Sequence, residues 1–217
     1  MVQIKRMKKI SISALLFMLV TSFQTAVVDK KEFEGIITYA IVVESKTSTI
    51  PTAKFQQLFG DTMKLSIKKG NYRMTYNGRD IKDIYYLTSR NKEYDRRNGI
   101  DTLFVTACEI ENRVLIRSAA QPTNEKIMNR TCEKLINDFG NTTNSYWYDP
   151  TIYLNPTPFE KLKFSFLNIY YEKAKSPWLK CKYEGKSFSL TYTAIAIKEC
   201  VLNDNIFQLP NLPERKL

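Results

Sequence analysis

Short segments in which apolar and polar residues alternate, separated by asparagine and glycine turns, constrain this chain more than any other feature. Met63, Leu65 and Ile67 alternate with polar residues, which is typical of a β-strand with one buried face. Comparable segments follow at intervals of about ten residues, with no helical pattern between them. The turn signals are Gly70-Asn71, Asn77-Gly78 and Asn98-Gly99. This spacing predicts an antiparallel meander and excludes a parallel α/β sheet, whose strands alternate with helices.

The other strand candidates begin with Phe33–Glu44, which is rich in β-branched and aromatic residues. The others are Tyr72–Tyr76, Ile81–Thr88, Glu93–Arg96, Ile100–Ala107, Glu109–Ser118 and Lys126–Asn137. Leu179–Tyr183 and Phe188–Ile197 form a hairpin pattern around Gly185. Asp204–Leu209 predicts a last short strand or a docked tail, and residues 119–124 predict a loop. The fold class is therefore mainly β.

Two helices are expected beside these strands. Thr157 is a candidate N-cap, Pro158 suits the first helical position, and Glu160 completes a capping box, so the spacing predicts a helix over Pro158–Lys173. Its apolar residues recur at helical spacing and require a sheet to cover. A shorter helix over Thr52–Phe59 ends at Gly60.

The N-terminus has the pattern of an export signal. Lys5, Arg6, Lys8 and Lys9 precede the apolar run Ile10–Val20, which is too short to span a bilayer comfortably. We expect residues 1–26 to be a cleaved signal peptide and residues 27–217 to form one domain, periplasmic or secreted, with no transmembrane span. Removal of this segment leaves 29 basic and 22 acidic residues, a net charge of +7. These charges are dispersed, and together with the export signal they disfavour nucleic acid as a partner.

The four cysteines are candidates for two disulfides, because an even number of cysteines in an exported chain is typical of a disulfide framework. They are Cys108, Cys132, Cys181 and Cys200. The sequence leaves their pairing open. A simple hairpin turning at Gly185 places Cys181 opposite roughly position 190, so a bond from Cys181 to Cys200 requires a bend or bulge. No pair has the spacing of a zinc knuckle, so no metal is expected.

The chain contains no histidine. This absence excludes Ser-His-Asp and Cys-His hydrolases and histidine metal sites, and no phosphate loop or dinucleotide fingerprint is present. We therefore expect no cofactor and assign no catalytic residue. A glycosidase of the carboxylate type remains an alternative, since it needs only two acids that the fold brings together. Asp138, Asp149 and Glu160 are available for it.

Aromatic residues are the positive chemical feature of the chain, which has 13 Tyr, 12 Phe and 2 Trp. They fill a core in one interpretation and line an apolar pocket between the sheet and its helix in the other. The candidates for such a lining are Trp147, Phe159, Phe164, Phe166, Tyr170 and Trp178.

The chain after the predicted signal peptide, and especially Thr131–Leu209, resembles a group of secreted Bacteroidota domains of unknown function. The resemblance rests on the strand segment RTCEKLI before the Tyr-Trp-Tyr and Asp-Pro element of residues 146–150, on NPTPFEKLKFSFL, on the hairpin LKCKYEGKSFSLTYTAIAIKE and on the closing DNIFQLP. These segments are similar to the GYxCKK, YWYTPEI, PL-x-x-EY and DSLFxIP elements of that group, relatives of the GLPGL-type family. The Gly-Leu-Pro-Gly-Leu motif itself is absent, and Lys175-Ser176-Pro177-Trp178 stands in a comparable place.

The resemblance implies the fold of the lipoprotein-carrier (LolA-like) class, a curved antiparallel sheet or half-open β-barrel with one or two helices on its concave face. It also implies a concave apolar surface. We therefore expect an exported binding protein for a lipid or other apolar ligand. The alternatives are a structural module of the cell envelope that binds a protein partner and no small molecule, and the carboxylate glycosidase.

Overall fold

The computed structural model describes residues 30–111 and 113–217. Residues Lys31–Leu217 form one compact unit. The signal peptide predicted for residues 1–26 lies outside the described residues. The fold is mainly β, with 45% strand and 14% helix, and its main element is a large, curved and unclosed sheet of 12 strands.

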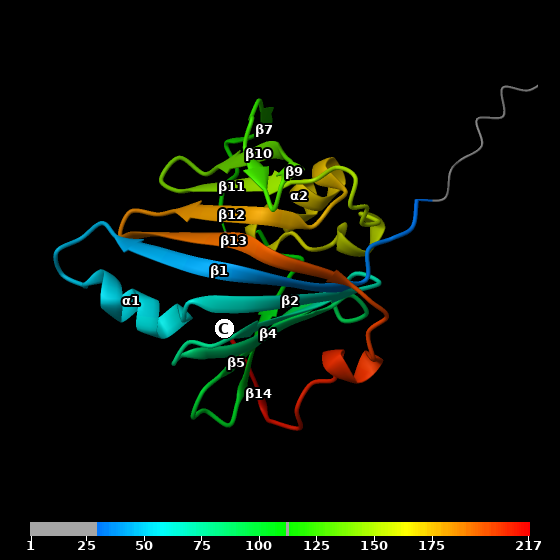
Figure 1. The fold of residues 1–217 in the computed structure, drawn as a ribbon. Coiled ribbons are helices and arrows are strands. Elements are labelled where there is room, and N and C mark those ends of the chain that lie inside the picture. The colour runs from blue at the N-terminus through cyan, green and yellow to red at the C-terminus, as the bar shows by residue number, and fades with distance from the viewer. Residues whose placement is uncertain (1–29, 112) are drawn as a thin grey trace, which may run out of the picture. The chain divides into compact units, whose positions relative to one another are not determined.

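The strands of this sheet lie in the order β14-β6-β5-β4-β3-β2-β1-β13-β12-β11-β10-β7 (Figure 1). The first half comprises β1 (Gly35–Ser45), β2 (Thr62–Lys68), β3 (Asn71–Tyr76), β4 (Ile81–Leu87), β5 (Lys92–Arg97) and β6 (Leu103–Ala107). The second comprises β7 (Arg117–Gln121), β10 (Glu133–Asp138), β11 (Thr143–Tyr148), β12 (Trp178–Glu184) and β13 (Phe188–Glu199), and β14 (Glu214–Lys216) ends the chain. A separate ribbon pairs β8 (Lys126–Ile127) with β9 (Arg130–Thr131).

The expected meander is confirmed in both halves of the sheet. From β1 the chain proceeds outward strand by strand to β6, then crosses to the far edge at β7 and returns to β13 beside β1. Within the described sheet, β14 and β6 are parallel and all other neighbours are antiparallel. The sheet is therefore mixed at one edge, where the sequence predicted only antiparallel pairs.

One face of the sheet, the inner face, carries the main core. Along β1, Ile37, Tyr39, Ile41 and Val43 are buried, whereas Val42 is 54% exposed. This alternation continues through the paired strands because directly opposite residues point to the same side of a sheet. Burial of this face supplies the main apolar driving force for folding.

Two β-bulges bend the sheet and change which residues face inward. Between Thr38 and Tyr39 the pairing of β1 with β13 shifts by one residue, which leaves Ile195 without a partner. Between Trp147 and Tyr148 the pairing of β11 with β12 shifts in the same way at Leu179. An extra residue on one strand increases local twist and bend, so both shifts contribute to the curvature.

Helices lie at two places on the inner face. The helix α1 (Thr52–Phe59) has the predicted bounds, and its Phe55 ring lies 4.8 Å from that of Phe188. The helix α2 (Leu167–Ala174) covers β11, and its Tyr170 ring lies 4.4 Å from that of Tyr146. Two short 3-10 turns, η2 (Thr157–Phe159) and η3 (Phe164–Phe166), precede α2.

The continuous helix predicted over Pro158–Lys173 is therefore wrong in its first half. Ser165 and Phe166 have left-handed backbone angles, with φ of 54° and 56°, which no α-helix accepts. The Thr157 side chain caps nothing. Instead its backbone N–H donates to the Asn155 side chain at 3.1 Å. Tertiary contacts override the local capping pattern, since the N–H groups of Lys163 and Phe164 donate to the Cys108 carbonyl oxygen and not within a helix.

Other differences from the predicted elements are local. Residues 109–111 and 113–116 belong to no strand, although a strand was predicted over Glu109–Ser118. The strand β7 occupies Arg117–Gln121 and so extends into the loop predicted over residues 119–124. Asp204–Phe207 forms the 3-10 turn η4. The tail after it covers the opposite, outer face, where Leu209 and Leu212 pack against the second apolar cluster of Tyr85, Tyr94, Leu103 and Val105.

A buried ion pair holds β3 and β4 together on the outer face. Asp83 has no exposed surface, and Oδ1 of its carboxylate lies 2.8 Å from Nη2 of Arg73. Thr75 donates to the same oxygen at 2.9 Å. Arg73 also donates to the Ile206 carbonyl oxygen in η4, so this pair connects the sheet to the tail.

We expect Asp83→Asn to lower the free energy of unfolding by about 1.5–3 kcal/mol, because it removes the buried charge that accepts hydrogen bonds from Thr75 and from Arg73, whose side chain is 28% exposed. Chemical denaturation followed by circular dichroism measures this change. Glu199→Gln is the control. Its exposed pair with Lys31, at 3.4 Å, is of the kind that contributes little to stability. Equal effects of the two substitutions would contradict the structural role of Asp83.

Candidate functional site

A cavity of about 160 Å³ lies between the two halves of the sheet on the inner face. One wall comes from β2 and β3, the other from β11 and β12, and η3 and α2 cover it. Its lining residues are Leu65, Tyr72, Met74, Asn144, Tyr146, Ser165, Leu167, Tyr171, Trp178 and Cys181. Every one of these side chains is neutral in its ordinary form, and most are apolar or aromatic, which is typical of a small-molecule site.

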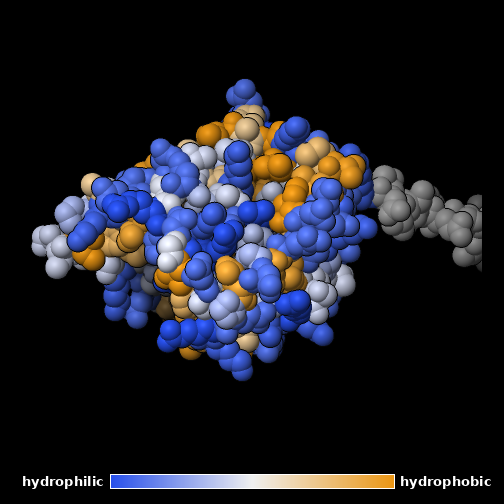
Figure 2. All heavy atoms as spheres, turned by 90° about the horizontal axis from the view of Figure 1, so that it is seen from below, coloured by the Kyte–Doolittle hydropathy of each residue, from blue (hydrophilic) through white to orange (hydrophobic). Residues whose placement is uncertain are grey.

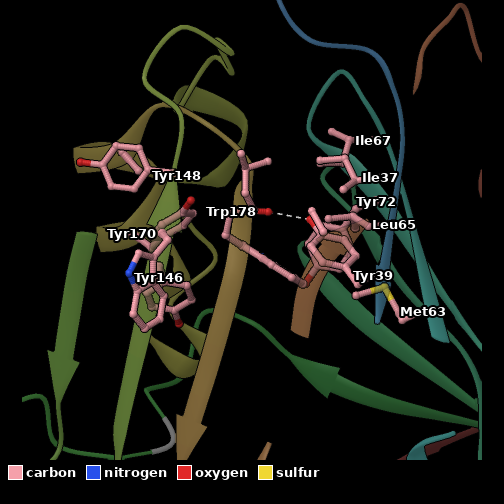
Figure 3. Close-up of a cluster of buried hydrophobic side chains, with 14 of the residues drawn as sticks. Ile37, Tyr39, Met63, Leu65, Ile67, Tyr72, Tyr146, Tyr148, Tyr170 and Trp178 are labelled. Carbon is pink, nitrogen blue, oxygen red and sulfur yellow. Dashed lines mark hydrogen bonds between the residues drawn. The ribbon is translucent and has the colours of Figure 1, made fainter. Parts of the chain in front are cut away.

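Trp178 is the residue whose position depends most on the fold. Strict alternation from Cys181 would direct Trp178 to the outer face, but the bulge at Leu179 returns it to the inner face opposite Tyr148. There its ring lies 4.3 Å from that of Tyr39, whose hydroxyl donates to the Trp178 carbonyl oxygen at 2.6 Å (Figure 3). This contact joins β12 to β1 and fixes one wall of the cavity.

The cover of the cavity is anchored by hydrogen bonds from its backbone. Lys163 and Phe164 donate their N–H groups to the Cys108 carbonyl oxygen at 2.7 and 3.1 Å. The Arg113 guanidinium donates to Oγ of Ser165 at 3.1 Å and lies 4.3 Å from the centre of the Phe139 ring. Two consecutive left-handed residues, Ser165 and Phe166, are thus held in place at the point where the chain turns into α2.

The groups on the cavity wall are held in their uncharged forms. Burial raises the pKa of the Cys181 thiol to about 12. Burial likewise raises the pKa of Tyr146 and of Tyr171. Because a thiol is a poor nucleophile while it stays protonated, Cys181 is suited to packing and not to covalent chemistry.

Glu93 is the acidic group next to this site. The Tyr72 hydroxyl, whose ring lines the cavity, donates to Oε1 of Glu93. Burial raises the pKa of Glu93 to about 7, against the opposing effect of that hydrogen bond, and the neighbouring Asp95 raises it further. The charge of Glu93 therefore changes near neutral pH.

Of the six aromatic residues predicted to line a pocket, Trp178 lies on the cavity wall. Phe159 lies in the core, 3.9 Å from the Tyr171 ring, and Tyr170 lies behind Tyr146. Phe166 packs on Phe139 at 5.8 Å, and Phe164 packs against the edge of the main core. Phe159 and Tyr170 thus contact two residues of the wall, Tyr171 and Tyr146.

Trp147 points to the outer face, away from the cavity. Its ring lies between the ammonium groups of Lys134 and Lys180, each 4.7 Å from the ring centre. It alternates with Tyr146 along β11, so the two cannot share a face. The sequence prediction did not include Leu65, Tyr72 and Met74, which come from the distant β2–β3 hairpin.

All four cysteines are free in the structure. Cys181 stands opposite Tyr192 on β13, whereas Cys200 follows that strand's last residue, Glu199. The separation along β13 is roughly 26 Å at the rise of an extended strand, so this fold cannot join Cys181 to Cys200. Cys108 and Cys132 are buried, and the two predicted disulfides are not formed.

Two of the three carboxylates considered for a glycosidase, Asp149 and Asp138, have local partners. Oδ2 of Asp149 lies 2.8 Å from Nη1 of Arg130, and Asp138 accepts the Gly140 N–H at 2.8 Å. Glu160 is exposed after η2.

Within residues 30–111 and 113–217, no cluster of three or more His, Cys, Asp or Glu side chains could hold a metal ion. In the same part of the chain, no helix has the length and apolar character needed to cross a membrane.

Comparisons with known proteins give no family for this chain. No protein-family model matches it, and no curated protein does. Among solved structures, PNGF-II in one crystal form is similar over 84% of this chain and 32% of PNGF-II, with 9% identity and a TM-score of 0.49. A second crystal form of PNGF-II gives 12% identity and a TM-score of 0.46. The chain thus spans about a third of PNGF-II.

A third similar structure is the Mycobacterium tuberculosis lipoprotein LppX. The match covers 78% of this chain and 89% of LppX, with 9% identity and a TM-score of 0.35. None of these similarities assigns a function. The resemblance to the secreted Bacteroidota domains stays a prediction.

The shifted pKa of Glu93 predicts how stability depends on pH. Between pH values of about 4.5 and 7 the folded protein keeps a proton that the unfolded chain has lost, so stability falls as pH rises through this window. At roughly 1.4 kcal/mol per pKa unit, the free energy of unfolding should fall by at most about 3 kcal/mol across this window. Glu93→Gln should abolish most of this fall. Denaturant titrations at several pH values measure it.

Glu109→Gln is the matched control, because Glu109 is an exposed carboxylate close to the same region of the chain. It should leave the pH dependence of the free energy of unfolding as in the unsubstituted protein. If Glu93→Gln did the same, Glu93 would have an ordinary pKa.

Proposed function

We propose that this chain is an exported binding protein that holds a small apolar ligand in the cavity between β2–β3 and β11–β12. The observation that carries the proposal is the lining of that cavity by uncharged, largely apolar and aromatic side chains. Displacement of water from such a surface favours binding of apolar molecules. The kinked segment before α2 and the bulge beside Trp178 both serve to shape this space.

The cavity volume limits the ligand. At about 160 Å³ the space is close to that of a cavity of roughly 150 Å³ that binds benzene. A single ring or a short chain fits this volume, whereas a long acyl chain does not. The proposal therefore narrows the lipid expected from the resemblance to a smaller apolar group.

Export forms part of the proposal. The basic residues followed by the apolar run Ile10–Val20 support removal of residues 1–26 during secretion. The periplasm or the extracellular space is then where the ligand is met.

An interaction module is the second candidate function. Ile110, Val114 and Ile116 are 63%, 78% and 66% exposed and lie close together in sequence, and an apolar patch of this kind can mark an interaction site. Figure 2 shows apolar side chains on one face in several patches separated by hydrophilic ones. A protein partner could cover such side chains.

The two tryptophans of the chain allow a direct test of ligand binding. In Trp147→Phe, the remaining Trp178 lies on the cavity wall, and in Trp178→Phe, the remaining Trp147 lies on the outer face. We expect toluene to change the fluorescence of the first variant saturably and to leave that of the second unchanged. Titrations of both purified variants with toluene measure this difference.

An equal response of both variants, or none in either, would contradict the proposed function. In that case the interaction module becomes the better interpretation. A pull-down with a variant in which Ile110, Val114 and Ile116 are replaced by serine would then examine the exposed apolar residues.

A further inference from the structure

One end of the cavity has hydrogen-bonding groups without partners. Asn144 lies on the wall with 7% of its surface exposed, and its Oδ1 has no partner, while its Nδ2 donates to the Tyr146 hydroxyl at 3.1 Å. Asn137 is fully buried, and neither its Oδ1 nor its Nδ2 has a partner. Oγ of Ser118 also lacks one.

These three side chains are neighbours across the sheet. Asn144 on β11 stands directly opposite Asn137 on β10, and Asn137 stands directly opposite Ser118 on β7. Directly opposite residues of antiparallel strands share a face, with Cβ atoms about 5 Å apart. The unpartnered groups therefore form one row on the inner face, and Asn144 brings that row to the cavity.

Such a row is unusual in a folded protein. Nearly all buried polar side-chain atoms have a hydrogen-bond partner, because a lost partner leaves the cost of desolvation uncompensated. An apolar core would favour leucine or valine at 137 and 144. Carboxamides at these two positions indicate that something other than the protein bonds to this end of the cavity.

The residues that line the cavity indicate the charge of the molecule that bonds to this end. No acidic or basic side chain lies among the ten residues that line the cavity. Two cations near this end already have hydrogen-bond partners in the protein. Arg113 donates to Thr142 and Ser165, and Lys173 donates to the Ser118 carbonyl oxygen at 2.9 Å. An acidic or basic group of a ligand would therefore meet no oppositely charged side chain on the cavity wall, which makes its burial there costly in free energy.

We infer that the ligand is a small uncharged amphipathic molecule, an apolar ring or short chain with one neutral polar group at Asn144. A primary amide suits this end best, because its N–H donates to Oδ1 of Asn144 and its oxygen accepts from a carboxamide. Asn137 stands opposite Asn144 on the next strand. This inference rests on the proposed function and specifies its ligand class.

The test compares toluene, benzamide and benzoate, which share one ring and differ in the polar group. The readout is Trp178 fluorescence in the Trp147→Phe protein. We expect benzamide to bind at least about 10-fold more tightly than benzoate. Asn144→Leu, added to this protein, should weaken benzamide binding by about 10-fold, the size of one or two hydrogen bonds, and leave toluene binding unchanged or tighter.

Asn98→Leu is the matched control. Asn98 is an exposed residue in the turn after β5, so its replacement should change none of the three affinities. The comparison of benzamide with benzoate needs no substitution at 144, so it remains decisive even if Asn144→Leu fails to fold.

The outcomes separate the two proposals. If toluene binds but benzamide does not, this inference is wrong, because the polar end then holds water only. The same follows if Asn144→Leu weakens the binding of toluene and of benzamide equally. In either case the proposed function stands. If benzoate binds as tightly as benzamide, the head group is anionic and the inference is wrong. If no probe changes Trp178 fluorescence, the proposed function itself fails.

Discussion

The pairing of β1 with β13 is the constraint on which the rest of the structure depends. The pairing runs from Gly35 opposite Glu199 to Ser45 opposite Phe188. It joins the meander of β1 to β6 to the later meander that ends at β13. The close approach at Gly35 excludes a side chain there, since a Cβ would lie 2.2 Å from the Lys198 carbonyl oxygen. Because this pair fixes the position of each meander, it also sets the width of the space between them.

The cavity results from irregularities and not from the regular sheet. The bulge at Leu179 turns Trp178 inward, the contact of Tyr39 with Trp178 fixes it, and the left-handed residues Ser165 and Phe166 bend the cover. Regular strands and a straight helix would pack to the density of an ordinary core. Strained or unpartnered groups are commonly retained where a protein binds something, and here both kinds lie around one space.

Local patterns predicted the regular parts of the fold. Alternation and turn residues indicated the β2–β3 and β12–β13 hairpins, and Gly60 indicated the end of α1, because each of these depends on residues close in sequence. The helix over Pro158–Lys173 was only half right, since its capping pattern competes with contacts to Cys108 and Arg113 that no local window contains.

The lining of the cavity shows which features of this protein the sequence determines and which depend on the tertiary structure. The sequence by itself determined that the chain is a meander of half-buried strands rich in aromatic residues, because alternation fixes which side chains share a face within one strand. Only the tertiary structure decided that Tyr72 and Met74 face Tyr146 and Trp178, that Trp147 lies outside, and that Asn144 and Asn137 are buried side by side. The physical reason is that strand order and a one-residue bulge are set by pairing between distant segments, and either one can reverse which face a side chain occupies.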